Sequence, residues 1–123
     1  MNILIVEDNE DNRRLAFKRL RAAGHSLVEA VDGAEARARL AEQHPDLILL
    51  DLQLPDISGL ELVAEIRASE SLKGITVVAC TAFAYAQDKE DALEAGCDGY
   101  ISKPVDIRRL PEQLEAILER SRR

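Results

Sequence analysis

Hydrophobic and polar positions alternate along the chain on two scales, and both scales predict regular structure. Short continuous apolar runs lie at residues 1–6, 46–51, 76–80 and 99–102, and a run with weaker alternation lies at 25–31. Apolar runs of this length are typical of strands that are buried on both faces of a sheet. We therefore predict five strands, of which the second is the least buried.

Between these strands, apolar residues recur at spacings of three and four, which indicates amphipathic helices. Gly24 and Gly96 follow two of these segments as C-terminal stops, and Ser58 precedes another as an N-cap. The five expected helices lie at residues 10–23, 34–42, 59–68, 88–95 and 110–120. Strands that alternate with helices in this way predict a single α/β domain, an open doubly wound parallel sheet with helices on both faces.

Four of the predicted strands lead into polar side chains. The first is followed by Glu7 and Asp8, the third ends at Asp51, the fourth is followed by Thr81 and the fifth by Lys103. The carboxyl ends of parallel strands meet at one edge of the sheet, where ligands bind in open α/β folds, so these side chains should form one site. A carboxylate at the tip of a buried strand is costly to desolvate, and Asp51 therefore calls for a cation nearby.

Three carboxylates held close together repel one another and ionise jointly only around a cation. An all-oxygen site favours a hard ion, and an open site that keeps several waters favours Mg²⁺ over Ca²⁺. Lys103 adds an ammonium group and Thr81 a hydroxyl donor. Groups of this kind bind a tetrahedral anion and stabilise its equatorial oxygens, which predicts phosphoryl transfer with Asp51 as the acceptor.

Each of these residues also has a purely structural explanation when it is considered alone. Lys103 could be an ordinary exposed lysine, Thr81 could satisfy local backbone, and Glu7 with Asp8 could be acids that favour the first turn of a helix. Asp51 resists such an explanation, because a buried structural acid would need a dedicated cation. Their common place at one sheet edge favours the functional interpretation.

Composition and charge restrict the possible partners. The chain has 123 residues, of which 46% are hydrophobic, and its formal net charge of -7 without a long basic stripe argues against nucleic acid as a direct partner. No apolar stretch approaches the roughly 20 residues of a membrane span, and no basic segment precedes the first apolar run as in a signal peptide. Cys80 and Cys97 show no metal or redox spacing. We expect a cytoplasmic protein without membrane insertion.

The ordered set of polar residues closely resembles the receiver domain of two-component response regulators over nearly the whole chain. The motifs that carry the resemblance are Glu7-Asp8-Asn9, Asp51 within the run 46–55 with Gly59 after it, Thr81-Ala82, and Lys103-Pro104. The resemblance implies a flavodoxin-like (βα)5 fold with strand order 2-1-3-4-5. It also implies transfer of a phosphoryl group from a phosphohistidine to Asp51. The Glu-Asp-Asn form is similar to single-domain regulators of cell division and to receivers attached to hybrid kinases.

The resemblance further implies a role for each residue of the metal site. Asp8, Asp51 and the backbone carbonyl of Gln53 would hold Mg²⁺. Because Glu7 stands where the family often has the shorter Asp, we expect it to reach the metal through a water. Lys103 would bind the phosphoryl group beside a cis peptide bond to the proline that follows it.

The same resemblance implies a switch that a partner protein reads. Thr81 would be the switch hydroxyl, which moves to bond the phosphoryl group, and Tyr100 would be the switch aromatic, which rotates into the vacated space. The surface of the fourth helix, the fifth strand and the fifth helix would then change. Phe83, two residues after Thr81, is expected to shield the aspartyl phosphate from water, and Gln53, two residues after Asp51, to tune the same chemistry.

One further position departs from the usual pattern. Pro111 lacks an amide hydrogen and disfavours helix at Leu110, so the last helix should begin near Pro111 after an irregular turn at 106–110.

The sequence leaves several functions open. A stand-alone receiver at 1–123 without an output domain would be either a phosphorelay shuttle, passing the group to a histidine phosphotransfer protein, or an allosteric regulator of a kinase or another downstream protein. A receiver excised from a hybrid histidine kinase is an alternative. An aspartyl-phosphate hydrolase of the haloacid dehalogenase type also uses a strand-end Asp and Mg²⁺, but it carries a second acid two residues later, where this chain has Gln53.

Overall fold

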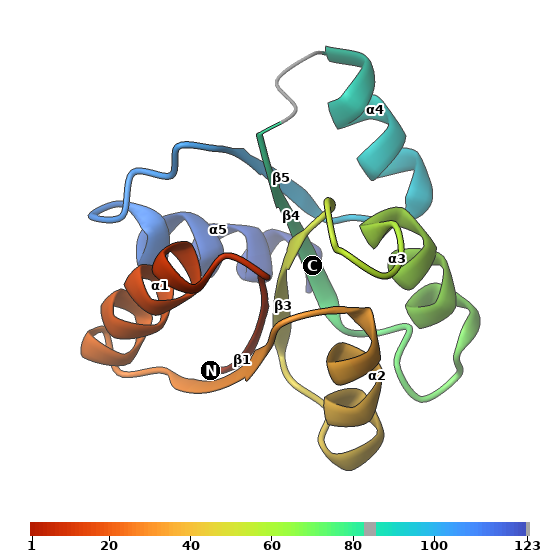
Figure 1. Ribbon diagram of the computed structural model, residues 1–123, viewed down its shortest axis with the longest axis horizontal. Helices are drawn as coiled ribbons and strands as arrows, with labels where there is room; N and C mark the ends of the chain where they lie inside the picture. Colours follow the sequence, from red (N-terminus) through yellow and green to blue (C-terminus); the bar gives the residue numbers. More distant parts are fainter. Residues whose placement is uncertain (83–85, 123) are drawn as a thin grey trace.

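Within residues 1–82 and 86–122, which the computed structural model describes, five strands and five helices alternate along the chain (Figure 1). The strands are β1 (Asn2–Val6), β2 (Ser26–Ala30), β3 (Leu47–Asp51), β4 (Thr76–Thr81) and β5 (Gly99–Ser102). The helices are α1 (Glu10–Ala22), α2 (Gly33–Glu42), α3 (Gly59–Ala68), α4 (Ala86–Ala95) and α5 (Leu110–Ser121). None of the helices found in these residues is long and apolar enough to cross a membrane.

The strands form one parallel sheet in the order β2-β1-β3-β4-β5, which confirms the predicted doubly wound fold and its strand order. Helices α1 and α5 cover one face of the sheet, and α2, α3 and α4 cover the other (Figure 1). Asp51 pairs with Cys80 and Thr81 pairs with Ser102 in the ladder, so the polar ends of the three strands β3, β4 and β5 lie at the same edge.

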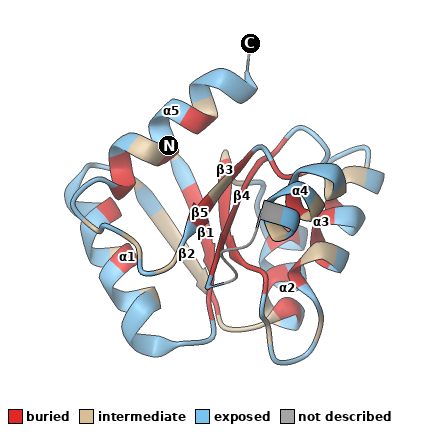
Figure 2. Cartoon of the chain, turned by 90° about the horizontal axis from the view of Figure 1, so that it is seen from above, coloured by how far each residue is buried: buried red, intermediate tan, exposed pale blue. Residues whose placement is uncertain are grey.

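The central strands are buried on both faces, which explains why their sequences are apolar without interruption (Figure 2). Successive side chains of a strand point to opposite faces. Ile3 and Ile5 of β1 therefore join the core beneath α1 and α5, whereas Leu4 and Val6 join the core beneath α2, α3 and α4. All four are at most 2% exposed.

The structure moves several predicted boundaries by one or two residues. Helix α1 ends at Ala22, and Gly24 follows with a φ of 96°, a left-handed conformation that glycine adopts without strain. Helix α4 begins at Ala86 rather than at residue 88, and β2 spans Ser26–Ala30 rather than 25–31. Strand β4 includes Thr81, so the hydroxyl residue is part of the ladder rather than the first residue after it.

The last helix begins one residue before the position expected from Pro111, because Leu110 is helical rather than part of the turn. Helix α5 begins at Leu110, and Pro111 occupies its first turn, where a backbone N–H has no partner inside the helix. The turn before it is closed by a hydrogen bond from Arg109 N to the Asp106 carbonyl at 3.0 Å. The irregular connection from β5 to α5 therefore lies beside the C-terminal edge of the sheet.

Candidate functional site

The backbone brings the predicted polar residues together at the C-terminal edge of the sheet. Glu7 follows β1, and its N–H donates to the Ala30 carbonyl at 3.0 Å, which extends the ladder between β1 and β2. Asp51 is the last residue of β3. The N–H of Lys103, just after β5, donates to the Thr81 carbonyl at 2.9 Å. Strand pairing thus fixes where each of these side chains starts.

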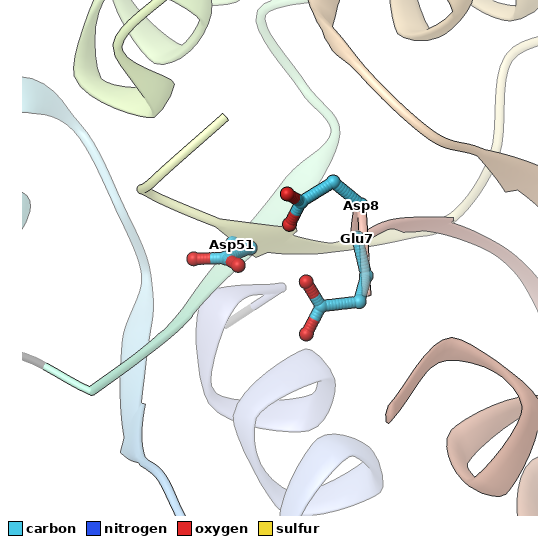
Figure 3. A group of neighbouring side chains, drawn as sticks. All are labelled: Glu7, Asp8 and Asp51. Carbon is cyan, nitrogen blue, oxygen red and sulfur yellow. The ribbon is translucent and has the colours of Figure 1, made fainter. Parts of the chain in front are cut away.

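The three carboxylates converge as the sequence predicts. Glu7, Asp8 and Asp51 each offer an oxygen, and these oxygens lie within 4.8 Å of one another. Figure 3 shows Glu7 and Asp8 reaching toward Asp51 from the end of β1. Glu7 and Asp51 are buried, at 6% and 5% exposure, whereas Asp8 is exposed. This arrangement has the hard oxygen donors that a divalent cation such as Mg²⁺ prefers.

Lys103 joins the two buried carboxylates. Its Nζ lies 2.5 Å from Glu7 Oε1 and 3.0 Å from Asp51 Oδ2. The Lys103-Pro104 peptide bond is cis, as expected. One ammonium beside two buried carboxylates and a third exposed one leaves the site with excess negative charge.

The pKa values of Glu7 and Lys103 reflect this excess. Burial raises the pKa of Glu7 to about 7, and the neighbouring Asp51 carboxylate adds to the rise, while Lys103 opposes it. For Lys103, burial disfavours the charged form, but the bonds to Glu7 and Asp51 outweigh burial and raise its pKa. Lys103 alone therefore does not compensate the site, and the donor set fits one further cation.

The orientation of the Asp51 carboxylate is fixed by both of its oxygens. Oδ2 faces Lys103, and Oδ1 accepts a hydrogen bond from the N–H of Gln53 at 2.9 Å. The loop from β3 to α3 then folds back, because Gly59 N donates to the Leu52 carbonyl at 2.9 Å. A Cβ on Gly59 would lie 2.6 Å from Leu52 Cα, so only glycine permits this approach. The acceptor carboxylate thus stands on a tightly closed loop.

Comparison with known protein families identifies the chain. A model of the response regulator receiver domain matches residues 3–115. The chain belongs to this family. Receiver domains are phosphoacceptor proteins of two-component signalling, and a histidine kinase is the partner that this membership implies.

Relatives and solved structures agree with this assignment. The chain is 42% identical over 117 residues to the polar-differentiation response regulator DivK of Brucella ovis, and the match covers 95% of each protein. A putative response regulator from Chloroflexus aurantiacus has a TM-score of 0.90 at 29% identity, covering 96% of this chain and 97% of that one. The Mn²⁺-bound form of response regulator Rcp1 has a TM-score of 0.79 at 34% identity, covering 94% and 90%.

The two expected switch residues of the receiver lie on the side of the sheet that α4 covers. Thr81 is completely buried at the end of β4. Tyr100 of β5 is half-buried and packs against the core beneath α2, α3 and α4. Its buried hydroxyl has no hydrogen-bond partner of good geometry among the described residues. Burial and the nearby Asp88 carboxylate of α4 raise the pKa of this hydroxyl.

The tuning roles expected of Phe83 and Gln53 both stay predictions. Phe83 lies outside the described residues, so its shielding role stays a prediction. Gln53 is exposed, and its N–H binds Asp51 as described above. The assignment of its carbonyl as a metal ligand also stays a prediction.

A cavity of about 440 Å³ adjoins the receiver site on the side of α1 and the connection from β5 to α5. Glu7, Asp51 and Lys103 lie in its wall, and apolar residues such as Val105 and Ile107 form much of the rest. Leu15 of α1 also lines it and is 55% exposed. This cavity is continuous with the predicted acceptor site.

Two residues support the site through contacts that the sequence analysis did not predict. Asn9 caps α1, because its Oδ1 accepts from Asn12 N at 2.9 Å, and an Asn directly before a helical segment is a local signal for such a cap. Asp56 binds the start of α2, whose residues lie 22 and 23 positions earlier in the chain. No local sequence pattern predicts a contact between residues that are so far apart in the chain.

Proposed function

We propose that this receiver domain takes a phosphoryl group from the phosphohistidine of a kinase or phosphotransfer protein onto Asp51. The observation that carries the proposal is the place of the Asp51 carboxylate, buried at a strand end between Lys103 and the acidic pair Glu7 and Asp8. A carboxylate oxygen of Asp51 forms the new bond to phosphorus, the P–N bond breaks, and the imidazole nitrogen keeps the electron pair. The product is an aspartyl phosphate.

Mg²⁺ fits the donor set of the site and is our proposed cofactor. Asp8, Asp51 and the Gln53 carbonyl would hold the ion directly, and Glu7 would act through a water. When bound, the ion would supply positive charge to the phosphoryl oxygens. Support comes from the three converging carboxylates and from the similar protein Rcp1, whose structure contains Mn²⁺.

The chain's own residues orient the acceptor and receive the transferred charge. Gln53 N–H and Lys103 hold the Asp51 carboxylate in one orientation, which reduces the entropy lost on reaching the transition state. The Lys103 ammonium, 3.0 Å from Asp51 Oδ2, is within reach of a phosphoryl oxygen on the same carboxylate. Lys103 would exchange part of its contact with Asp51 for the phosphoryl group.

Phosphorylation would act through Thr81 and Tyr100. The new phosphoryl group adds charge and strong acceptor oxygens, to which the Thr81 hydroxyl would bond. Tyr100 would then turn inward, and the surface of α4, β5 and α5 would change for a downstream protein. Burial of Tyr100 against the same core that α4 covers supports this coupling.

We infer a cytoplasmic regulator, by analogy with the DivK proteins, 95% of whose length the chain matches. A phosphorelay shuttle and an allosteric regulator are both compatible with the site. A shuttle passes its phosphoryl group to the histidine of a phosphotransfer protein, whereas an allosteric regulator retains it and binds its target. Mixing phosphorylated protein with such a phosphotransfer protein and following the label separates the two.

The core proposal is tested with acetyl phosphate as a small phosphodonor in the presence of Mg²⁺. Intact-mass spectrometry should show one added phosphoryl group on the wild-type protein and none on Asp51→Asn, and chelation of Mg²⁺ should prevent the addition. The control is Glu65→Gln, which removes a carboxylate of α3 that lies away from the site. This variant should gain one phosphoryl group as the wild-type protein does. Phosphorylation of Asp51→Asn at wild-type level would overturn the assignment.

A further inference from the structure

One carboxylate outside the site holds the loop that connects β3 to α3. Asp56 Oδ1 accepts hydrogen bonds from Gly33 N at 2.9 Å and from Ile57 N at 3.0 Å, and Asp56 Oδ2 accepts from Ala34 N at 2.9 Å. Gly33 and Ala34 are the first two residues of α2. A single side chain therefore joins the tip of the acceptor loop to the start of a different helix.

This contact suits the N-terminus of α2. The first N–H groups of a helix have no partner inside it, and the helix dipole favours negative charge there. Asp32, the N-cap of α2, accepts from Glu35 N at 2.8 Å, and Asp56 accepts from the two N–H groups that come before. The hydrogen bond from Gly33 N is the main reason why the pKa of Asp56 is lowered.

The loop also lies in close steric contact with the same helix. A Cβ built on Gly33 would stand 2.6 Å from Ile57 Cγ1 and 3.2 Å from Asp56 Oδ1. Glycine at the first position of α2 therefore lets the loop approach the helix backbone directly. Charge and shape act together at this point, and the loop cannot tilt away without breaking both contacts.

The base of the loop carries the atoms that matter for the site. Asp51 and Gln53 are joined by a hydrogen bond, and Gln53 forms a bridge to Ser58 across the loop. Gly59 N closes the base through the Leu52 carbonyl. These contacts tie the two ends of the loop together, and the hydrogen bonds of Asp56 hold its tip against α2.

We infer that Asp56 is a positioning residue for the metal site, acting through the loop to fix the direction of the Gln53 backbone carbonyl. The inference rests on the proposed function, because it takes that carbonyl as a Mg²⁺ ligand. Asp56 itself has no part in binding the ion or the phosphoryl group. Residues that hold a metal ligand from outside commonly change metal affinity by about 10- to 100-fold when they are removed.

The test is a Mg²⁺ titration followed by amide chemical shifts in NMR. Asp56→Ala should raise the dissociation constant for Mg²⁺ by about tenfold. Asp56→Asn should give a smaller rise, because one amide oxygen can accept from Gly33 N or Ala34 N while its NH₂ group faces the other donor. Glu65→Gln is the matched control. Glu65 also joins α2 to α3, through Arg37 at 2.9 and 2.6 Å, but does not touch the loop, so Mg²⁺ affinity should stay at the wild-type value.

A second readout needs no metal. In metal-free Asp56→Ala, the Gln53 and Gly59 amides should exchange with solvent faster than in the wild type, and in Glu65→Gln they should exchange at the wild-type rate. Mg²⁺ affinity of Asp56→Ala within about twofold of wild type would overturn this inference alone. A wild-type protein whose Asp8, Asp51 and Gln53 signals do not respond to Mg²⁺ would instead overturn the proposed function, together with the inference that depends on it.

Discussion

The buried Glu7 carboxylate should make the metal-free protein less stable as the pH rises through neutrality. In the folded protein its pKa is raised from 4.5 to about 7, chiefly by burial. Between these two values the folded chain binds a proton that the unfolded chain has released. Stability gained from this proton is therefore present at low pH and is lost as the pH rises through about 7.

The magnitude follows from the two pKa values. At pH 5.5 the folded-state proton contributes about 2 kcal/mol to the free energy of unfolding, and at pH 8 it contributes almost nothing. Screening by solvent reduces this little, because Glu7 is only 6% exposed. The acids with lowered pKa values, Asp46, Asp56 and Glu65, act in the opposite direction but at lower pH, and they are ionised in both states above pH 5.5.

Urea unfolding followed by circular dichroism, with EDTA present, measures the effect. From pH 8 to pH 5.5 the midpoint of the wild-type protein should rise by about 1 M urea. The midpoint of Glu7→Gln, which cannot ionise at this position, should change by much less, and all other groups are common to the two proteins. Equal changes in both proteins would refute the assignment of the raised pKa to Glu7.

Three further predictions test the surroundings of the site. Lys103→Met should lower the free energy of unfolding by about 3 kcal/mol at pH 8, because two buried carboxylates lose their ammonium partner. At pH 5.5, where Glu7 is protonated, the loss should be smaller. Equal losses at both pH values in urea titrations would contradict this. Gly59→Ala should lower the free energy of unfolding by about 1–3 kcal/mol in the same assay, because the added Cβ would clash with the backbone of Leu52. The control Gly74→Ala, which has open space around its Cβ, should be neutral or slightly stabilising. Arg67→Ala should lower the free energy of unfolding by about 2–3 kcal/mol, because the hydrogen bonds to the Gly96, Lys73 and Ile75 carbonyls and to Asp98 are lost. These groups lie at the opposite edge of the sheet, so the affinity for Mg²⁺ should not change. A change in that affinity would show coupling between the two edges.

The fold was predictable because burial on both faces leaves a strong trace in the sequence. The strands β1, β3 and β4 read as apolar runs because every position in them is buried, except Asn2 at the start of β1. The edge strand β2 is half-buried, and its predicted limits were too wide. The start of α4 was placed two residues late because Ala86 and Gln87 carry no capping or periodic signal that marks the start of a helix.

The location of the site was also predictable, but the burial and the contacts of its individual residues were not. The sequence separated Glu7 from Asp8 only by side-chain length, and it did not predict that Glu7 is buried against Lys103 while Asp8 is exposed. Asp56 was missed because the N–H groups that it binds belong to another helix, far away in the chain. Such differences depend on the register between strands and on where the loops pack, and neither can be read from a single sequence.

Side chains alternate between the two faces of the sheet along each strand, and this alternation explains on which face each residue of the site lies, once the register is known. Ile5, Leu49 and Ile101 belong to the core beneath α1 and α5, so the residues two positions later, Glu7, Asp51 and Lys103, continue on that side of the sheet. Val77 and Ala79 belong to the core beneath α2, α3 and α4, so Thr81 continues on the other side, where Tyr100 also packs. The ionic contacts thus lie toward α1 and α5, and the expected switch residues lie toward α4. A phosphoryl group on Asp51 would have to be sensed across the edge of the sheet, from one side to the other. Thr81 stands at the end of the strand next to Asp51, where such a crossing is shortest.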